Sequence, residues 1–556
     1  MTKQVLIINI TRMGDLVQTV PLLRRLEEEW PGVAIDLVID TPLAPMAALL
    51  PVLRQVHTYN FTTVFKNPQG TQQGDELLSP DIAAWAQSLA AIGYDRVINL
   101  TFTRWSGLLA AAIGAPDTRG AVTTSGISIL KNPWLAYCVD MQQARRFNRF
   151  SLVDLYALGG SGPGPFTPIR LSLPGEAEGW AERYLDQIGT GHIPIAVQIG
   201  ASQTRKAWRP EYFGRTMAAL SRRLKVAFVL IGTRQEANSV QQAVDAYHQA
   251  GGVGLLCDAV GQTGVSQLAA LLSRCRLLLT NDTGPMHLAV GVGTPVIDLS
   301  VGHVDFHETG PYGPGHWVIQ PVLDCAPCGY TQVCAHHACM DQLVPDQVAA
   351  LALHVLGRMP FPESWTGVRV YESGVDEDGL ACYQQRAGQR NPVADSYGPF
   401  WRRYWYEQFT GQLSRVAIDH TPPDLAEQQS CLRQLALGLD RLVQHTEQFV
   451  ELCREPFVAK STLKAAQKEL VAERQQVMAI AMASPAFGPI TAALLRELYE
   501  SRVLNARARA DLHAQAYRTW KARMYDVMEQ LQQAQDTRRM RRSPVWSDLP
   551  MAEGSK

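Results

Sequence analysis

The alternation of short apolar runs with longer amphipathic segments is the feature that most restricts how this chain can fold. Near the N-terminus apolar runs lie at 5–10, 35–39 and 96–100, with helix-like segments at 20–29 and 82–92. This alternation is typical of parallel strands joined by crossover helices. Further apolar runs lie at 194–199, 225–231, 254–257, 277–280 and 295–299. The sequence therefore predicts two Rossmann-like α/β halves.

Two changes in composition divide the chain. The glycine- and proline-rich stretch 159–165 cannot hold a regular helix or strand, which favours a boundary there. After about residue 363 strand signals fade, and stretches rich in Ala, Gln, Leu, Glu and Arg predict long helices. We therefore expect Rossmann-like domains at 1–165 and 166–360, followed by an all-α C-terminal extension of unknown role at 361–556.

One predicted helix of the extension carries an apolar face. Tyr517, Trp520, Met524, Val527 and Leu531 recur at steps of three and four, which places them on one side of a helix. Packing within the extension and a dimer seam both fit this pattern. Because barely two heptads are visible, the pattern favours packing.

Charge and composition restrict the partners and the compartment. The chain of 556 residues has 51 basic and 52 acidic residues, so its net charge of -1 predicts no nucleic-acid partner. The N-terminus runs directly into a predicted strand without a secretory signal, and ten cysteines are scattered along the chain. Both features favour the cytoplasm. The uncharged stretch 477–495 contains Pro485 and Pro489, which favour a turn between two helices over a membrane span.

The segment 281–287, Asn-Asp-Thr-Gly-Pro-Met-His, lies between an apolar run and a helix-like run. Asp282 or Thr283 can cap the helix that follows, and Gly284 lets the backbone approach a ligand. Free N–H groups at a helix start favour an anion such as a phosphate. An ordinary helix cap is the alternative interpretation of this segment alone.

The wider context resembles glycosyltransferase family 9, the family that contains the lipopolysaccharide heptosyltransferases. The resemblance covers residues 1 to about 358. The blocks that carry it are 5–21, 198–211, the Asp-Thr-Gly-x-x-His segment at 282–287, 294–296 and 309–313. It implies a GT-B fold, in which two Rossmann-like domains face a cleft, the first binding the acceptor and the second the nucleotide-sugar.

The resemblance also implies roles for individual residues. Asp15 matches the catalytic base and Lys206 the lysine that meets the donor phosphates. Arg12 would then lie close enough to Asp15 to help bind an anionic acceptor, although an arginine in a loop is more often solvated. The donor-binding positions are Ser202, Glu236, Asp282, Thr283, Gly284 and His287. A helix cap at Asp15, a surface carboxylate at Glu236 and a structural histidine at His287 are the competing interpretations. Trp208 could pack on the base of the Lys206 loop, and a plain core tryptophan is the competing interpretation of it.

Sugar transfer needs a base for the acceptor hydroxyl and positive charge for the departing diphosphate. No Asp-x-Asp pair stands at a strand end, and Lys206 with a helix start can stabilise the diphosphate, so we expect metal-independent transfer without a catalytic cofactor. The adjacent Arg205 leaves the assignment of that positive charge open. Inversion at the sugar carbon, ADP-heptose as donor and lipopolysaccharide core as acceptor are implied by the resemblance.

A second cluster lies at Cys325, Cys328, Cys334 and Cys339, with His336 and His337 inside it. Four soft ligands could enclose a structural zinc ion. Their spacing differs from the paired Cys-x2-Cys arrangement, which favours free or redox-active thiols slightly over a metal site.

Two segments of the extension mix features that suit a lipid surface. Residues 400–406 combine aromatic and basic side chains, and residues 538–542 contain four arginines. Such segments can contact lipid headgroups, which predicts peripheral contact with the cytoplasmic face of the inner membrane, although an ordinary amphipathic helix is the commoner explanation. Two further functions stay open: transfer of another nucleotide-sugar to a different glycan or protein, and an inactive scaffold.

Overall fold

The computed structural model describes residues 2–61, 80–124, 126–330, 333–417, 422–455, 457–503 and 505–542. The chain forms two compact units. The first, the α/β unit, contains Met1–Ala136 and Phe150–Arg390, and the second, the helical unit, contains Tyr137–Arg149 and Asn391–Lys556.

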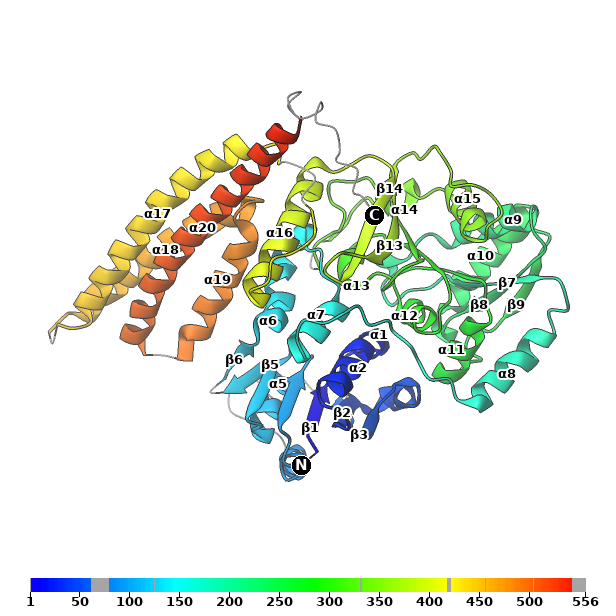
Figure 1. Cartoon of the computed structure of the whole chain (residues 1–556), viewed down its shortest axis with the longest axis horizontal. Helices are drawn as coiled ribbons and strands as arrows, with labels where there is room; N and C mark the ends of the chain where they lie inside the picture. The colour runs from blue at the N-terminus through cyan, green and yellow to red at the C-terminus, as the bar shows by residue number, and fades with distance from the viewer. Residues whose placement is uncertain are drawn as a thin grey trace, which may run out of the picture. The chain divides into compact units, whose positions relative to one another are not determined.

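The first sheet of the α/β unit has six strands in the order β3-β2-β1-β4-β5-β6 (Figure 1). The strands are β1 (Gln4–Ile8), β2 (Ala34–Asp40), β3 (Leu53–Tyr59), β4 (Arg96–Asn99), β5 (Asp117–Thr124) and β6 (Ile127–Lys131). All neighbours are parallel except β5 and β6. The helices of this half are α1 (Met13–Gln18), α2 (Val20–Glu29), α4 (Pro80–Ala90), α5 (Arg104–Ile113) and α7 (Leu152–Gly160). The reversal of strand order beside β1 creates a switch point, where sheets of this class bind ligands.

The second sheet has eight strands in the order β14-β13-β12-β11-β10-β7-β8-β9. Its strands are β7 (Ile193–Gln198), β8 (Val226–Ile231), β9 (Leu255–Asp258), β10 (Leu277–Thr280), β11 (Val296–Leu299), β12 (Trp317–Pro321), β13 (Val368–Val375) and β14 (Ala381–Ala387). The strands from β7 to β12 pair in parallel. All residues of β8, β10, β11 and β12 are buried, as expected for a sheet covered by helices, whereas the edge strand β9 is partly exposed. The expected pair of Rossmann-like domains in a GT-B arrangement is confirmed.

Eight helices accompany this second sheet within the described residues. They are α8 (Gly175–Asp186), α9 (Pro210–Ser221), α10 (Ala237–Gln249), α11 (Val265–Ser273), α12 (Gly284–Gly291), α13 (Phe306–Thr309), α14 (Ala338–Gln342) and α15 (Pro345–Val355). Of these, α12 follows β10 directly and carries the predicted anion site at its start.

The expected start of the helical extension at residue 361 is corrected by β13 and β14. These strands form an antiparallel hairpin that continues the second sheet from β12. Residues 376–380 make the turn, in which Asp376 accepts backbone hydrogen bonds from Asp378 and Leu380. Strand-forming residues alternate on both sides of this Asp-Gly turn, a local hairpin signal that the sequence interpretation missed. The helical part begins after Arg390.

The helical unit contains long helices that lie side by side in Figure 1. They are α16 (Pro392–Thr410), α17 (Leu425–Leu452), α18 (Lys460–Ala483), α19 (Gly488–Glu500) and α20 (Ala506–Arg542). The apolar face formed by Tyr517, Trp520, Met524, Val527 and Leu531 is buried, which confirms packing within the unit. Residues 484–487 connect α18 to α19 as the expected turn. Among the described residues, none of the helices combines the length and the apolar composition of a membrane span.

The prediction that residues 400–406 present aromatic side chains to lipid is wrong. Phe400, Trp401, Tyr404, Trp405 and Tyr406 are all buried. They stack on one another within α16, as in the pair Trp401–Trp405 at 5.9 Å between ring centroids. Aromatic residues at steps of three to five fill a helix interface as readily as a membrane boundary, and here burial decides between the two. The side chains of 538–542 lie outside the described residues.

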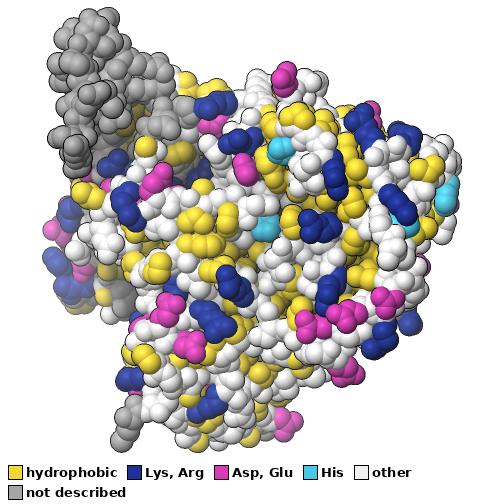
Figure 2. Space-filling view, turned by 45° about the vertical axis from the view of Figure 1, so that its right-hand side comes forward, with side chains coloured by type: hydrophobic (Ala, Val, Ile, Leu, Met, Phe, Trp, Pro, Cys, Tyr) yellow, Lys and Arg dark blue, Asp and Glu magenta, His cyan; other side chains and the backbone are white. Residues whose placement is uncertain are grey.

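The surface charges agree with the near-zero net charge. On the face shown in Figure 2, acidic and basic side chains are interspersed over the described residues.

Candidate functional site

Asp15 lies in the first turn of α1, just beyond the carboxyl end of β1. Its carboxylate accepts a hydrogen bond from the Thr11 hydroxyl, and its backbone carbonyl accepts one from the amide of the buried Asn9 at 3.1 Å. The N-cap of α1 is Arg12, whose side chain is exposed and makes no cap hydrogen bond. Asp15 therefore does not cap the helix, and its half-buried carboxylate is held at the switch point by its own loop.

The start of α12 leaves its backbone uncapped. Thr283 is the N-cap with an extended φ of -142°, but its side chain makes no cap hydrogen bond. Its hydroxyl instead donates to the Asn281 carbonyl at 3.3 Å. Pro285 has no N–H to satisfy, so the helix start can turn its remaining donors toward an anion.

The predicted donor loop and the predicted base lie against each other. A Cβ on Gly14 would stand 2.7 Å from Cδ2 of His287, and one on Gly284 would stand 2.2 Å from Cε of Met13. Glycine at both positions therefore lets α1 and α12 approach closely. The carboxyl ends of β1 and β10 are thus brought to one place from separate sheets.

His287 lies at the centre of this contact. It is buried, and burial lowers its pKa, opposed by the negative charges of Asp282 and Asp15 and reinforced by Lys206. A histidine with this environment is neutral at pH 7. Its Nδ1 atom has no hydrogen-bond partner among the described residues. The four predicted residues Asp15, Lys206, Asp282 and His287 therefore share one electrostatic environment.

Lys206 is directed to the donor loop. Its Nζ atom donates to the Asp282 carbonyl at 2.9 Å. The neighbouring Arg205 points elsewhere, since its guanidinium donates to Gln203 at 2.8 Å and to the Tyr330 carbonyl at 2.7 Å. The structure therefore assigns the positive charge at this loop to Lys206. Ser202, four residues earlier, is exposed.

Glu236 has a structural role that the sequence did not reveal. Its carboxylate accepts hydrogen bonds from the Thr233 N–H at 2.6 Å and from the Thr233 hydroxyl at 2.9 Å, forming a capping box. The Gln198 amide donates to its other oxygen at 3.1 Å. A Cβ on Gly200 would lie 2.0 Å from this carboxylate, so Glu236 covers the carboxyl end of β7. A surface carboxylate without partners is thereby ruled out.

Asn281 and Thr309 support the donor loop and were missed as site residues. The Asn281 amide donates to the Ile199 carbonyl at 3.0 Å, while its oxygen accepts from the Trp208 N–H at 2.9 Å, which ties the Lys206 loop to the Asp282 loop. Thr309 donates to the Asp282 carboxylate at 2.6 Å. Both lie within segments noted in the sequence, but only the fold shows their partners.

Trp208 is a core residue. It is fully buried, and its indole N–H donates to the carbonyls of Met340 and Leu343. The competing interpretation of Trp208 is thus the correct one.

Asp298 is a further residue that the sequence reasoning missed. Register across β7, β10 and β11 places Gln198, Thr280 and Asp298 in one row at the carboxyl end of the sheet. Asp298 is fully buried, and neither carboxylate oxygen has a hydrogen-bond partner among the described residues. Burial raises its pKa well above the ordinary value, the nearby Asp282 adds to the increase, and Lys206 opposes it. The sequence signal that could have identified Asp298 as a site residue is the presence of an aspartate within the apolar run 295–299.

No disulfide joins the four cysteines of the predicted metal cluster, and their thiols influence one another. Burial raises the pKa of Cys328 to about 11, and Cys325, Cys339 and Cys334 add to the increase. Within the described part of the chain, no group of three or more His, Cys, Asp or Glu side chains could hold a metal ion. The predicted structural zinc therefore gains no support from the described geometry.

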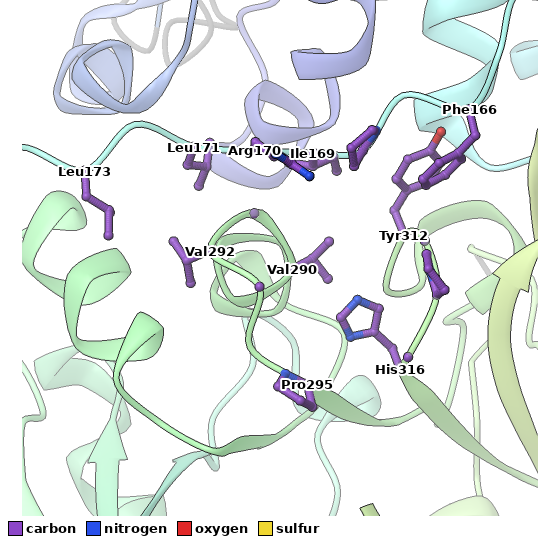
Figure 3. Close-up of a pocket in the computed structure, with 16 residues that line it drawn as sticks. Phe166, Ile169, Arg170, Leu171, Leu173, Val290, Val292, Pro295, Tyr312 and His316 are labelled. Carbon is purple, nitrogen blue, oxygen red and sulfur yellow. The ribbon is translucent and has the colours of Figure 1, made fainter.

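A separate cavity of about 540 Å³ lies along the linker between the two Rossmann-like halves. In Figure 3, Ile169 and Leu171 of the linker face Val290 and Val292 at the end of α12, with His316 deeper in the cavity. None of the predicted donor- or acceptor-binding residues lines it. The cavity borders the opposite end of α12 from the predicted donor site.

Comparison with known proteins identifies relatives of the α/β unit. Residues 82–337 match the sequence model of the family described as glycosyltransferase family 9 (heptosyltransferase). Lipopolysaccharide heptosyltransferase 3 of Escherichia coli is 22% identical over 286 residues, which cover 51% of this chain and 79% of that protein. Lipooligosaccharide heptosyltransferase 2 of Campylobacter jejuni is 27% identical over 168 residues, 29% of this chain and half of that protein.

Among solved structures, a family 9 glycosyl transferase from Veillonella parvula matches with a TM-score of 0.49 and 22% identity. The match covers 64% of this chain and 98% of that one.

Proposed function

Since this chain belongs to glycosyltransferase family 9, a family of heptosyltransferases, we propose that it transfers heptose from ADP-heptose to a lipopolysaccharide core or related surface-glycan acceptor. The observation that carries the proposal is the convergence of Asp15, Lys206 and Asp282 around the buried His287. The names of the curated relatives support a heptosyl donor and a lipopolysaccharide acceptor.

The chemistry follows from the roles proposed for these residues. The acceptor hydroxyl attacks the anomeric carbon of the sugar while the carboxylate of Asp15 takes its proton. The bond between that carbon and the phosphate oxygen breaks, and ADP leaves with the bonding electrons. Attack opposite to the leaving group inverts the anomeric carbon.

The leaving diphosphate gains negative charge as this bond breaks. Lys206 and the uncapped start of α12 at Thr283 and Gly284 would stabilise that charge, so the proposed transfer requires no metal ion. Asp282, held by Thr309, would face the donor sugar, and Glu236 and Ser202 would border the nucleoside. Arg12 would meet an anionic acceptor.

We also propose that the reaction takes place in the cytoplasm, where the acceptor would be reached by peripheral contact with the inner membrane. Interspersed charges on the visible face provide no broad basic field for this contact.

The first experiment is calorimetric titration with ADP, UDP, GDP and CMP, with magnesium and with EDTA. Selective binding of ADP that is unaffected by EDTA supports the proposal. Preference for another nucleotide would move the activity to a different sugar, and no binding at all would favour the inactive scaffold.

The second experiment tests the base. Asp15→Asn should lower the rate of heptose transfer by about 100-fold or more while ADP binding is kept, because it removes only the proton acceptor. Transfer is measured by mass spectrometry of the product. Asp186→Asn, which changes an exposed carboxylate at the end of α8, is the matched control and should leave the rate unchanged. Full activity of Asp15→Asn would exclude Asp15 as the base.

A further inference from the structure

The helical unit encloses a cavity of about 840 Å³ that the proposed transfer does not use. It is lined by residues of α17, α18, α19 and α20, and its volume falls within the usual range for small-molecule sites.

The walls of this cavity are largely aliphatic and aromatic. Phe449 of α17, Leu470, Met478 and Met482 of α18, and Leu495 of α19 contribute them. All of these except Met478 are only half-buried, so the lining is accessible from the cavity. Flexible methionine side chains suit a surface that adapts to an alkyl chain.

The polar lining has one sign of charge. Three arginines, Arg474, Arg502 and Arg509, contribute to it, and the lining residues include no Asp or Glu. No ion pair to any of these three guanidinium groups is present in the described part of the unit, although Arg502 lies over the Tyr499 ring at 4.6 Å. Three acidic residues of this unit pair with other cations: Glu473 with Arg441, Glu447 with Arg518, and Glu500 with Arg496.

The pKa of His513 is affected by the positive charge of the arginines that line the cavity. Its ring bonds the Ser501 hydroxyl at 2.8 Å, and its pKa falls to about 4 because of burial, with Arg474 and Arg509 lowering it further. The histidine is therefore neutral at pH 7, and the two arginines beside it lack a compensating anion from the cavity lining.

We propose that this cavity binds an anionic lipid, with an acyl chain against the apolar walls and a phosphate headgroup at Arg474, Arg502 and Arg509. Arginine suits this role because its planar fork binds phosphate oxygens in pairs. An acyl chain accounts for the apolar walls, which free phosphate would leave exposed. The site lies within the helical unit and does not depend on the proposed transferase activity.

The test is calorimetric titration of the full chain with lysophosphatidic acid below its micelle concentration. Glycerol 3-phosphate supplies the headgroup alone, and monoacylglycerol supplies the chain alone. We expect lysophosphatidic acid to bind at least about tenfold more tightly than either fragment, because only it meets both parts of the site. Equal binding of glycerol 3-phosphate would identify a phosphate site and overturn the proposal, and equal binding of monoacylglycerol would remove the role of the arginines.

Variants locate the site. The double variant Arg474→Gln/Arg509→Gln should weaken lysophosphatidic acid binding by about tenfold or more, because each substitution removes charged hydrogen bonds to the phosphate. Arg433→Gln, which changes an exposed arginine of α17 outside the cavity, is the matched control. Ala479→Trp places a large ring in the cavity from an exposed lining position and should abolish binding without changing the melting temperature. Loss of binding in Arg433→Gln equal to that in the double variant, or full binding in Ala479→Trp, would contradict the assignment.

Discussion

At the scale of single residues, neighbouring side chains of similar chemistry have separate roles. Lys206 and Arg205 both carry positive charge, but Lys206 reaches the Asp282 carbonyl whereas Arg205 reaches the Tyr330 carbonyl. The direction of each side chain, which sequence order does not show, decides which of them can meet a diphosphate.

This difference gives a prediction for the pair. Lys206→Met should lower the transfer rate by about 100-fold and weaken ADP binding, because it removes the charge proposed to stabilise the leaving group. Arg205→Met should have a much smaller effect on both. Steady-state kinetics and ADP titration measure the two variants side by side. A larger loss of transfer rate and ADP binding in Arg205→Met than in Lys206→Met would contradict the assignment of this charge to Lys206.

His316 gives a prediction about stability at low pH. Burial lowers its pKa to about 4, whereas an unfolded histidine has a pKa near 6.5. As the pH falls below about 6.5, His316 becomes protonated in the unfolded chain but stays neutral in the folded chain, so the free energy of unfolding decreases. Between pH 7 and pH 5 this decrease amounts to about 2 kcal/mol.

Urea unfolding at both pH values checks this expectation. Between pH 7 and pH 5, the free energy of unfolding of His316→Leu should fall by about 2 kcal/mol less than that of the unchanged chain. This difference does not depend on the stability of the variant at pH 7. The exposed His248, changed to Leu, is the control, and the remaining histidines contribute alike to both chains. Identical pH dependence of the two variants would show that His316 titrates normally.

At the scale of elements, the contact of α1 with α12 assembles the candidate site. It joins the Asp15 loop of the first half to the Asp282 loop of the second through Gly14, Met13, Gly284 and His287. Because His287 is buried, its ring has little room to move away from a larger neighbour.

Gly14→Ala should therefore disturb both stability and function. Its Cβ would lie 2.7 Å from the His287 ring, so α1 and α12 must separate, which is expected to cost about 1–3 kcal/mol of stability and to reduce transfer. Gly175→Ala at the start of α8 adds a methyl group where no atom lies within 4 Å and should be tolerated. Thermal unfolding and transfer assays compare the two. Wild-type behaviour of Gly14→Ala would mean that the helices need no such close approach.

At the scale of the whole molecule, the helical unit is built from two separate parts of the sequence. The segment 137–149 belongs to it together with the residues after 390. Tyr137 packs against Trp405 and Phe409 at 6.1 and 6.4 Å between ring centroids, and Asp140 bonds Arg496 at 2.9 Å. Burial raises the pKa of Asp140 to about 6, and Arg496 opposes this increase.

A chain ending after residue 390 should therefore aggregate. Removing the helices exposes Tyr137 and leaves Asp140 without Arg496, so the segment 137–149 loses the partners that bury it. Size-exclusion chromatography measures the monomer fraction. A chain ending after residue 542 keeps every contact described here and is the control. A monomeric chain of 390 residues would show that the segment 137–149 folds without the helical unit.

Local sequence pattern was sufficient to predict the parallel strands of both sheets, the helix start at Gly284 and the long helices of the extension. Strand and helix periodicity, strand-end polar residues and turn-forming glycines are properties of neighbouring residues, so they are visible in one dimension. The burial of the apolar face of α20 and the turn between α18 and α19 were also predicted from such patterns.

Only the tertiary structure decided the features that depend on contacts between distant residues. These are the close approach of Gly14 to His287, the direction of Lys206, the burial of the aromatic residues of α16, the addition of β13 and β14 to the second sheet, and the cavity among α17 to α20. The physical reason is that burial, electrostatic environment and cavity shape depend on which segments the fold packs together, and residue spacing along the chain does not specify that packing.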